Sequence, residues 1–298
     1  MTDWATFAAA TVALTLLLLS LTRRSQRTLK RVRIVDSRSD VAVGGDHTTE
    51  FERTTAGGAA APDVSAGDTA DPESNTADDD PVARPSQRRD EPVLTTATLL
   101  ANAALSQLLA LIVLIGIAWW TAVPVSAFGV GGESVRSISL GPLTNAAWFL
   151  GIGTAVGIAL YVGNEAVARL GTRVGVSPST RLREAMAPED ARGWALLLGV
   201  VLPIIAVFEE ALFRGALIGA LAVGFAIDPW VLAVGSSVAF GFGHGAQGRF
   251  GIAVTALLGF GLAAVFILTG SLFVVIVAHY VVNALEFVVH EKYEIELG

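Results

Sequence analysis

The 298-residue sequence contains no cysteine, only two lysines (Lys30 and Lys292) and only 16% charged residues. Without cysteine the chain has no disulfide, no thiolate nucleophile and no thiolate ligand for a metal. The low charge excludes an ordinary soluble domain, in which about 25% of residues are charged. Hydrophobic residues make up 53% of the chain, and its mean hydropathy is +0.60. This composition predicts an all-α fold, a polytopic bundle of membrane helices.

Seven apolar segments bounded by polar residues are candidate membrane spans. They are residues 4–21, 99–122, 146–168, 193–226, 230–244, 251–269 and 272–289. A helix rises about 1.5 Å per residue, so segment 193–226 would extend over about 51 Å, against about 30 Å for the hydrocarbon core of a bilayer. It is therefore either one long tilted helix or two helices broken near Pro203 or Gly215. We expect seven transmembrane helices, with eight as the alternative.

Basic residues are distributed asymmetrically around these segments. Asp3 precedes the first segment and six Lys or Arg residues follow it, the reverse of the charge order in a secretory signal peptide. Five arginines follow the third segment, whereas the loop after the second holds only Glu133 and Arg136. Because cytoplasmic loops are enriched in Lys and Arg, we expect a multi-pass protein of the cell (plasma) membrane with its N-terminus outside and residues 23–95 in the cytoplasm.

Residues 34–92 form a polar segment unlike the rest of the chain. The stretch 36–91 holds 14 Asp or Glu residues and five Arg, a net charge of −9 within a chain of net charge −7. Its hydrophobicity is too low to offset the entropy cost of ordering the backbone. We therefore expect a disordered acidic tether, which is either a plain spacer or an interaction tail.

Three charged residues lie inside the apolar segment 193–226, namely Glu209, Glu210 and Arg214. Each charged residue near the centre of a membrane helix costs about 2.5–3.5 kcal/mol, so this pair of acids indicates a function. Glu210 and Arg214 are four residues apart and can pair on one helix face, while Glu209 points about 100° away. A buried carboxylate without its own cation suits a general base. The alternative is one buried ion network that only holds helices together.

Two histidines and an asparagine interrupt the apolar segments that follow. His244 ends one segment, and His279 and Asn283 share a helix face in the middle of the last. Each has an ordinary explanation, an interfacial position for His244 and hydrogen bonding between helices for the other two. Separate explanations for each residue are less satisfactory than a common one, because the polar residues occur on three successive apolar segments. We therefore expect Glu209, His244 and His279 to converge on one water-accessible cavity.

Other polar residues in the apolar segments are assigned to the membrane surface. Glu286 and His290 lie toward the end of the last segment, so we expect them at its rim, with long side chains reaching the headgroups. Asn164 and Glu165 receive the same interpretation. Glycines spaced by four residues, a pattern typical of closely packed helices, occur as Gly153 with Gly157 and as Gly215 with Gly219.

Three motifs occur in a fixed order in the second half of the chain: Glu209-Glu210-x-x-x-Arg214, Phe240-x-x-x-His244 and His279-x-x-x-Asn283. In this order they resemble the motifs of the CPBP family of intramembrane metalloproteases, which includes the type 2 CAAX prenyl proteases and is also called Abi. The expected organisation is an anchor at 1–22, a basic then acidic linker at 23–95, two transmembrane helices in 96–192, a CPBP-like catalytic core at 193–290 and a polar tail at 291–298.

The resemblance implies an intramembrane endopeptidase that cuts a membrane-associated or lipidated substrate near its C-terminus. Carried onto this sequence, it implies that Glu209 and His244 activate the attacking water and that His279 and Asn283 stabilise the oxyanion. Arg214 and the second glutamate of its motif would orient the site, and the two glutamates could exchange roles.

The use of a metal stays open at the level of the sequence. A carboxylate with two imidazoles is a credible zinc set, which would consist of Glu209, His244 and His279. The chain has no His-Glu-x-x-His motif, and a metal-free mechanism in which a glutamate activates the water is equally compatible with these residues.

Two functions of other classes are compatible with the same residues. One is a non-catalytic membrane protein of the peptide-binding or immunity type, and the other is a transporter that uses the Glu and His side chains as a proton relay. The complete set of motifs argues against the first, and the lack of an internal repeat argues against the second. The expected partners are membrane lipids and a membrane-associated peptide or prenylated protein, with no role for nucleic acid.

Overall fold

The computed structural model describes residues 1–29, 95–131 and 142–293, and these residues form helices and turns with no strand. The predicted all-α fold is confirmed for this part of the chain, whereas the predicted acidic tether lies outside the described residues. The helices are α1 (Trp4–Leu29), α2 (Thr96–Trp120), η1 (Val125–Phe128), α3 (Pro142–Arg173), α4 (Arg181–Met186), α5 (Ala191–Leu196), η3 (Leu197–Val201), α6 (Leu202–Glu210), η4 (Ala211–Ala220), α7 (Leu221–Phe225), α8 (Pro229–Gly243), η5 (Gly245–Gln247), α9 (Gly248–Thr269), α10 (Leu272–Phe287) and η6 (Val288–Lys292).

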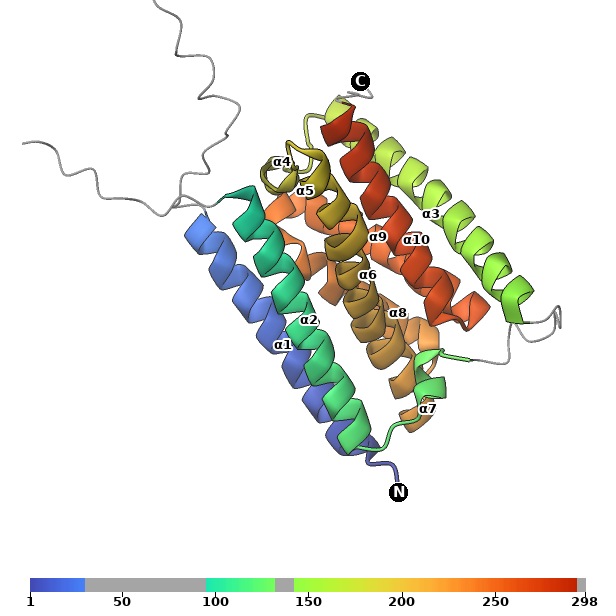
Figure 1. The fold of residues 1–298 in the computed structure, drawn as a ribbon. Coiled ribbons are helices and arrows are strands. Elements are labelled where there is room, and N and C mark those ends of the chain that lie inside the picture. Colours follow the sequence, from blue (N-terminus) through green and yellow to red (C-terminus); the bar gives the residue numbers. More distant parts are fainter. Residues whose placement is uncertain (30–94, 132–141, 294–298) are drawn as a thin grey trace, which may run out of the picture. The chain divides into compact units, whose positions relative to one another are not determined.

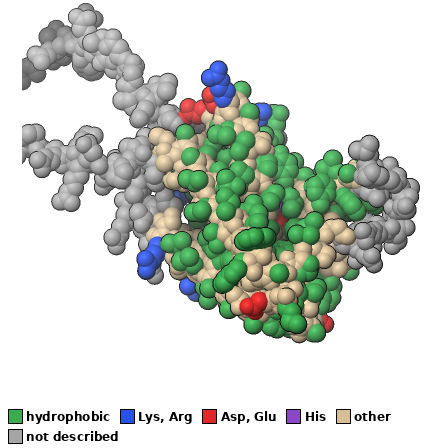
Figure 2. All heavy atoms as spheres, turned by 60° about the horizontal axis from the view of Figure 1, so that its bottom comes forward, with side chains coloured by type: hydrophobic (Ala, Val, Ile, Leu, Met, Phe, Trp, Pro, Cys, Tyr) green, Lys and Arg blue, Asp and Glu red, His purple; other side chains and the backbone are tan. Residues whose placement is uncertain are grey.

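Six helical segments are long and apolar enough to cross a membrane, so the chain is a multi-pass membrane protein. Helix α8 is also apolar but has only 15 residues. The described residues thus contain six full-length candidates and one shorter helix, and the predicted number of seven or eight spans is not confirmed. Figure 2 shows that hydrophobic side chains cover much of the visible surface, as expected for helices in contact with lipid.

The segment predicted at 193–226 is one continuous helix from Ala191 to Phe225 and is not broken into two. Within it, α6 lies between the π-helical segments η3 and η4. Pro203 lies in the first turn of α6, directly after η3, where its missing N–H disturbs the α-helical ladder least. π-Helical turns widen the coil and often occur at functional sites. Here the transition from α6 to η4 falls immediately after Glu210.

Helices α6 and η4 lie at the centre of the bundle (Figure 1). Helix α6 packs against α2 and α10, and η4 packs against α8 and η1. Around them, α3 packs against α10, α9 packs against α8, and α1 lies beside α2. The two glutamates at the end of α6 are therefore surrounded by the helices that carry the other motifs.

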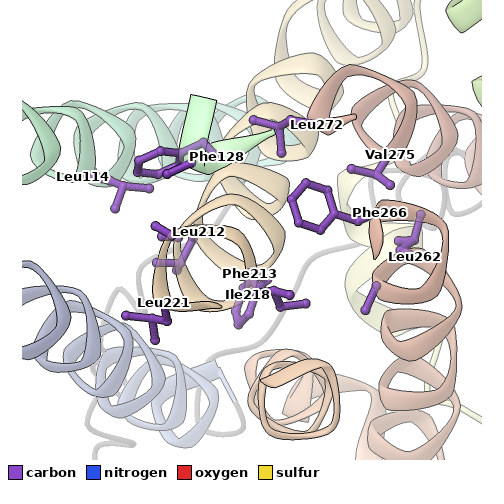
Figure 3. Packing of buried hydrophobic residues seen from close by; sticks show 14 of the residues in the cluster. Leu114, Phe128, Leu212, Phe213, Ile218, Leu221, Leu262, Phe266, Leu272 and Val275 are labelled. Carbon is purple, nitrogen blue, oxygen red and sulfur yellow. The ribbon is translucent and has the colours of Figure 1, made fainter. Parts of the chain in front are cut away.

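The largest apolar core surrounds η4, as Figure 3 shows. Leu212, Phe213 and Ile218 of η4 are buried there together with Phe128 of η1 and Phe266 of α9. Between helices in a membrane, close packing replaces the hydrophobic effect as the main attraction. The packing of η4 against its neighbours therefore holds the helix turn that follows the two glutamates.

The junction between α9 and α10 determines where α10 begins. Gly270 ends α9 with a φ of 62°, a left-handed conformation that glycine adopts at little cost. Ser271 then caps α10, because its hydroxyl oxygen accepts a hydrogen bond from the N–H of Val274 at 3.4 Å. This tight connection places α9 and α10 side by side and fixes the start of the helix that carries His279.

Helices α3 and α10 approach closely along a seam formed by two glycines of α3. A Cβ atom added at Gly153 would lie 2.8 Å from the backbone oxygen of Val274, and one added at Gly157 would lie 2.7 Å from that of Ala278. The close packing predicted for this pair is confirmed. The other predicted pair of glycines, on η4, faces η1 in the same way.

Replacing Gly157 with Ala should destabilise the protein, because the new methyl group would overlap the carbonyl of Ala278 and push α10 away. Overpacking of this kind costs about 1–3 kcal/mol. Gly163→Ala on the same helix is the matched control, since no atom lies within 4 Å of a Cβ at Gly163. Thermal unfolding of both variants in detergent measures the difference, and equal melting temperatures would contradict a close seam.

Candidate active site

Glu209 and Glu210 end α6, and Arg214 lies one turn later in η4. Their exposed fractions are only 8%, 0% and 1%. A guanidinium N–H (Nη1) of Arg214 donates to Oε1 of Glu210 at 2.6 Å, as the spacing of four residues predicts. The other terminal nitrogen donates to the backbone oxygen of Gly259 at 2.8 Å, and the guanidinium lies 4.6 Å from the centre of the Phe240 ring. Arg214 therefore connects η4 with α8 and α9.

Helix α10 places the imidazole of His279 against both carboxylates. Its Nδ1–H donates to Oε1 of Glu210 at 2.7 Å, and its Nε2 lies 3.6 Å from Oε2 of Glu209. The proton is assigned to Nδ1 because Glu210, beside Arg214, acts as an acceptor. His279 is buried, so its Nε2 edge is directed toward Glu209 inside the bundle.

The ring of Phe240 contacts both histidines of the motifs. Its centre is 5.8 Å from that of the His279 ring, in an edge-to-face arrangement, and 4.6 Å from that of the His244 ring. His244 follows the last turn of α8, and its Nδ1–H donates to the backbone oxygen of Phe240 at 3.0 Å. This hydrogen bond leaves Nε2 as the ring nitrogen that carries the lone pair in the neutral form.

The two oxygens of Glu209 have different surroundings. Oε1 accepts a long hydrogen bond from Nε2 of Gln107 at 3.5 Å, whereas Oε2 is buried and accepts no hydrogen bond from the described residues. A buried carboxylate oxygen of this kind is a strong acceptor for any donor that reaches it. Gln107 lies on α2, outside the three motifs, and was not predicted. Its only signal is an amide side chain in an apolar segment.

If the site hydrolyses peptides, as the resemblance of its motifs implies, replacing Gln107 with Ala should lower the rate about tenfold, because about 1.4 kcal/mol of positioning of Glu209 would be lost. Gln107→Glu should have a larger effect, since a second carboxylate would face Glu209 at the same distance. Asn102→Ala is the matched control, an amide removed from an exposed position of the same helix. Initial rates on one peptide would compare the three variants, and a wild-type rate in Gln107→Ala would exclude this role.

The structure brings four of the predicted site residues into direct contact. They are Glu209, Glu210, Arg214 and His279. His244 is connected to this group through the Phe240 ring and not by a hydrogen bond. Asn283 lies one turn after His279 on α10, is half-buried, and forms no side-chain hydrogen bond with another described residue. His244 and His279 thus both contact Phe240, and Asn283 follows one turn after His279.

The predicted zinc ligands Glu209, His244 and His279 do not form a compact ligand set in the described part of the chain. There the cluster with donor atoms all within 4.8 Å of one another is a different one, formed by Glu165, Glu286 and His290. Zinc binds its ligands at about 2.0–2.3 Å, which requires closely spaced donors. The motif residues as arranged do not fit such an ion, so the chemistry is developed below from the side chains alone.

Four polar residues predicted at the membrane rim instead pair with one another across two helices. Nδ2–H of Asn164 donates to Oε1 of Glu286 at 2.7 Å, and Nε2–H of His290 donates to Oε1 of Glu165 at 2.9 Å. This pairing was not predicted, because α3 and α10 are neighbours only in the tertiary structure, and the position of these residues at the membrane surface stays a prediction. All four side chains are half-buried.

One comparison with known proteins concerns the segment that contains this site. Residues 191–285 match the model of a family described as type II CAAX prenyl endopeptidase Rce1-like. The match covers all three motifs and confirms the resemblance to CAAX prenyl proteases over this segment. No curated protein and no solved structure matches the chain.

Proposed function

Because residues 191–285 match a family of CAAX prenyl endopeptidases, we propose that this protein is an intramembrane endopeptidase. It hydrolyses a peptide bond near the C-terminus of a membrane-associated or lipidated substrate, for which a prenylated protein is the first candidate. The nucleophile is a water molecule activated by carboxylate and imidazole groups, and no metal is required.

The observation that supports this proposal most directly is the difference between the two adjacent glutamates. Oε1 of Glu210 accepts hydrogen bonds from both Arg214 and His279. Glu209 is paired with no Arg or Lys among the described residues, whereas Oε2 of both glutamates is buried without a hydrogen bond from them, so the difference between the two is the cation beside Glu210. Two carboxylates in such different surroundings are typical of sites in which one acts as a base and the other holds the geometry. We assign the first role to Glu209 and the second to Glu210.

Hydrolysis begins when Oε2 of Glu209 takes a proton from a water whose oxygen attacks the carbonyl carbon of the scissile amide. As the new C–O bond forms, the electrons of the carbonyl π bond move to its oxygen. Asn283 stabilises this oxyanion, and so does His279 once its Nε2 carries a proton in addition to the one on Nδ1. Collapse of the tetrahedral intermediate breaks the C–N bond, and the departing amine receives the proton held by Glu209. His244 orients the water through the lone pair on Nε2.

The purified full-length protein in detergent should cleave a farnesylated peptide that ends in a CAAX sequence and release a short C-terminal fragment, detected by mass spectrometry. The same peptide without the lipid is the comparison, and slower cleavage of it would show that the protein prefers lipidated substrates. His244→Ala should lose cleavage while its elution volume and helical content are unchanged. The result that would contradict the proposal is a wild type that cleaves no peptide but drives uptake of a solute into cells. If that uptake is lost in His244→Ala, the protein is a transporter.

We also propose that this is a plasma-membrane protein with its N-terminus outside, because Asp3 precedes α1 and arginines follow it. The absence of cysteine allows labelling of single introduced cysteines without background. An impermeant maleimide applied to intact cells should label Val125→Cys, and should label Val174→Cys only after lysis. Both positions are exposed, at 70% and 72%. The reverse pattern would invert the topology.

A further inference from the structure

A second polar site connects α3 with α10 and η6, away from the motif residues. It consists of Glu165 on α3, Glu286 near the end of α10 and His290 in η6, which we call the α3–α10 cluster. Nε2 of His290 lies 2.9 Å from Oε1 of Glu165 and 3.9 Å from Oε2 of Glu286. One donor atom from each residue lies within 4.8 Å of the other two. Glu286 is seven residues after His279, so about 10 Å along the helix separates this cluster from the candidate active site.

The charges around the cluster do not balance. Arg183 of α4 donates from Nη1 to Oε2 of Glu286 and from Nε to Oε1 of Glu291, both at 2.8 Å. With the glutamates ionised and His290 neutral, three carboxylates lie near the paired guanidinium of Arg183 and near Arg169, one turn after Glu165 on α3, which leaves one negative charge in a half-buried place. Grouped carboxylates of this kind are unfavourable unless a cation compensates them. A bound cation would supply the missing positive charge.

Tyr161 provides an independent indication of a ligand at this place. It lies on α3 one turn before Glu165 and is only 7% exposed. Its hydroxyl has no hydrogen-bond partner among the described residues, although it lies within the electrostatic range of two carboxylates and two guanidinium groups, those of Glu165, Glu286, Arg183 and Arg169. Buried hydroxyls are normally paired. A water molecule bound to a cation in the cluster would pair with this hydroxyl.

We propose that the α3–α10 cluster binds one divalent transition-metal cation, with Zn²⁺ as the preferred ion. A carboxylate oxygen of Glu165, one of Glu286 and Nε2 of His290 are the ligands, and water completes a tetrahedral shell. Ligands about 2.1 Å from such an ion are about 3.4 Å apart, between the two distances measured here, so only small side-chain shifts are required. An imidazole with two carboxylates favours Zn²⁺ over Mg²⁺, which prefers oxygen ligands.

The bound ion would cross-link α3 to the helix that carries His279 and Asn283. The stability gained from the ion would add to that from the close packing at the glycine seam, which joins the same two helices elsewhere along their length. The cation is not part of the hydrolytic steps, and this site is independent of the proposed function.

The test uses the full-length protein in detergent, stripped with a chelator and then titrated with Zn²⁺ against a chromophoric competitor, with Mg²⁺ as the comparison. The wild type should retain about one zinc ion per chain after dialysis, and its melting temperature should rise by about 5–10 °C at a hundredfold excess over the dissociation constant. Glu165→Gln and His290→Gln should bind zinc more than about 100-fold more weakly, beyond the loss typical of outer-shell partners. Unchanged elution volume and helical content would show that the variants fold.

Two further variants make the result specific. Glu291→Gln removes a charge from the same network but not a proposed ligand, so its affinity for zinc should fall by no more than about tenfold. Glu209→Gln should retain zinc, because it changes only the motif site. A wild type without zinc binding, equal weakening in Glu165→Gln and Glu291→Gln, or zinc lost only in Glu209→Gln would each overturn the proposal.

Discussion

Glu209→Gln should lower the rate of peptide hydrolysis by about 10²–10⁴-fold, the range in which a positioned general base contributes. The amide has nearly the shape of the carboxylate and can keep the contact with Gln107, but it cannot accept a proton from water. The loss should appear in kcat with little change in KM, because the side chain acts in the transition state more than in substrate binding.

The matched control is Glu184→Gln, an exposed glutamate of α4 that contacts Thr180. It should retain the wild-type rate. Elution volume and melting temperature would show that Glu209→Gln is folded. Full activity in Glu209→Gln, with activity lost instead in Glu210→Gln without loss of stability, would exchange the roles of the two glutamates.

The second large effect is expected from the ion pair of Glu210 and Arg214. Both side chains are almost fully buried, and their closest atoms are 2.6 Å apart. Removing one partner leaves the other charge buried without compensation, which typically costs about 3–5 kcal/mol. Arg214→Met and Glu210→Gln should therefore each lower the melting temperature strongly, and both should inactivate the enzyme.

The double variant Glu210→Gln/Arg214→Met separates stability from catalysis. With both charges removed, most of the lost stability should return, because no unpaired charge stays in the core. Activity should not return, since His279 would have no carboxylate to receive its Nδ1–H. Thermal unfolding and initial rates on the four proteins of this cycle provide the measurement. Additive losses of stability would show that the two side chains are not coupled.

The motif spacing predicted the local part of the site well. The pairing of Glu210 with Arg214 follows from two positions four residues apart on one helix, and the structure confirms it. The predicted approach of His279 to Glu209 is also confirmed, at 3.6 Å. The convergence of His244 with them is not established, because the described contacts of its imidazole are with Phe240.

Contacts between distant segments could not be predicted in the same way. Gln107 meets Glu209 from a helix about a hundred residues earlier, and no periodicity within α2 indicates that neighbour. Glu165 and His290 were assigned to the rim for the same reason, since a polar residue near a helix end suits both an interface and a buried pair. The π-helical turns around α6 likewise depend on tertiary packing. The sequence therefore could not decide whether 193–226 forms one helix or two.

The order in which the helices are synthesised has a consequence for the cell. Arg214 pairs with Glu210 one turn away but takes its other partners from α8 and α9, and His279 arrives only with α10, the last long helix described. During translation the two glutamates enter the membrane well before the groups that complete their surroundings. A nascent chain that has not yet inserted α10 therefore lacks the hydrogen bond between His279 and Glu210, so its site stays incomplete until that helix is in place.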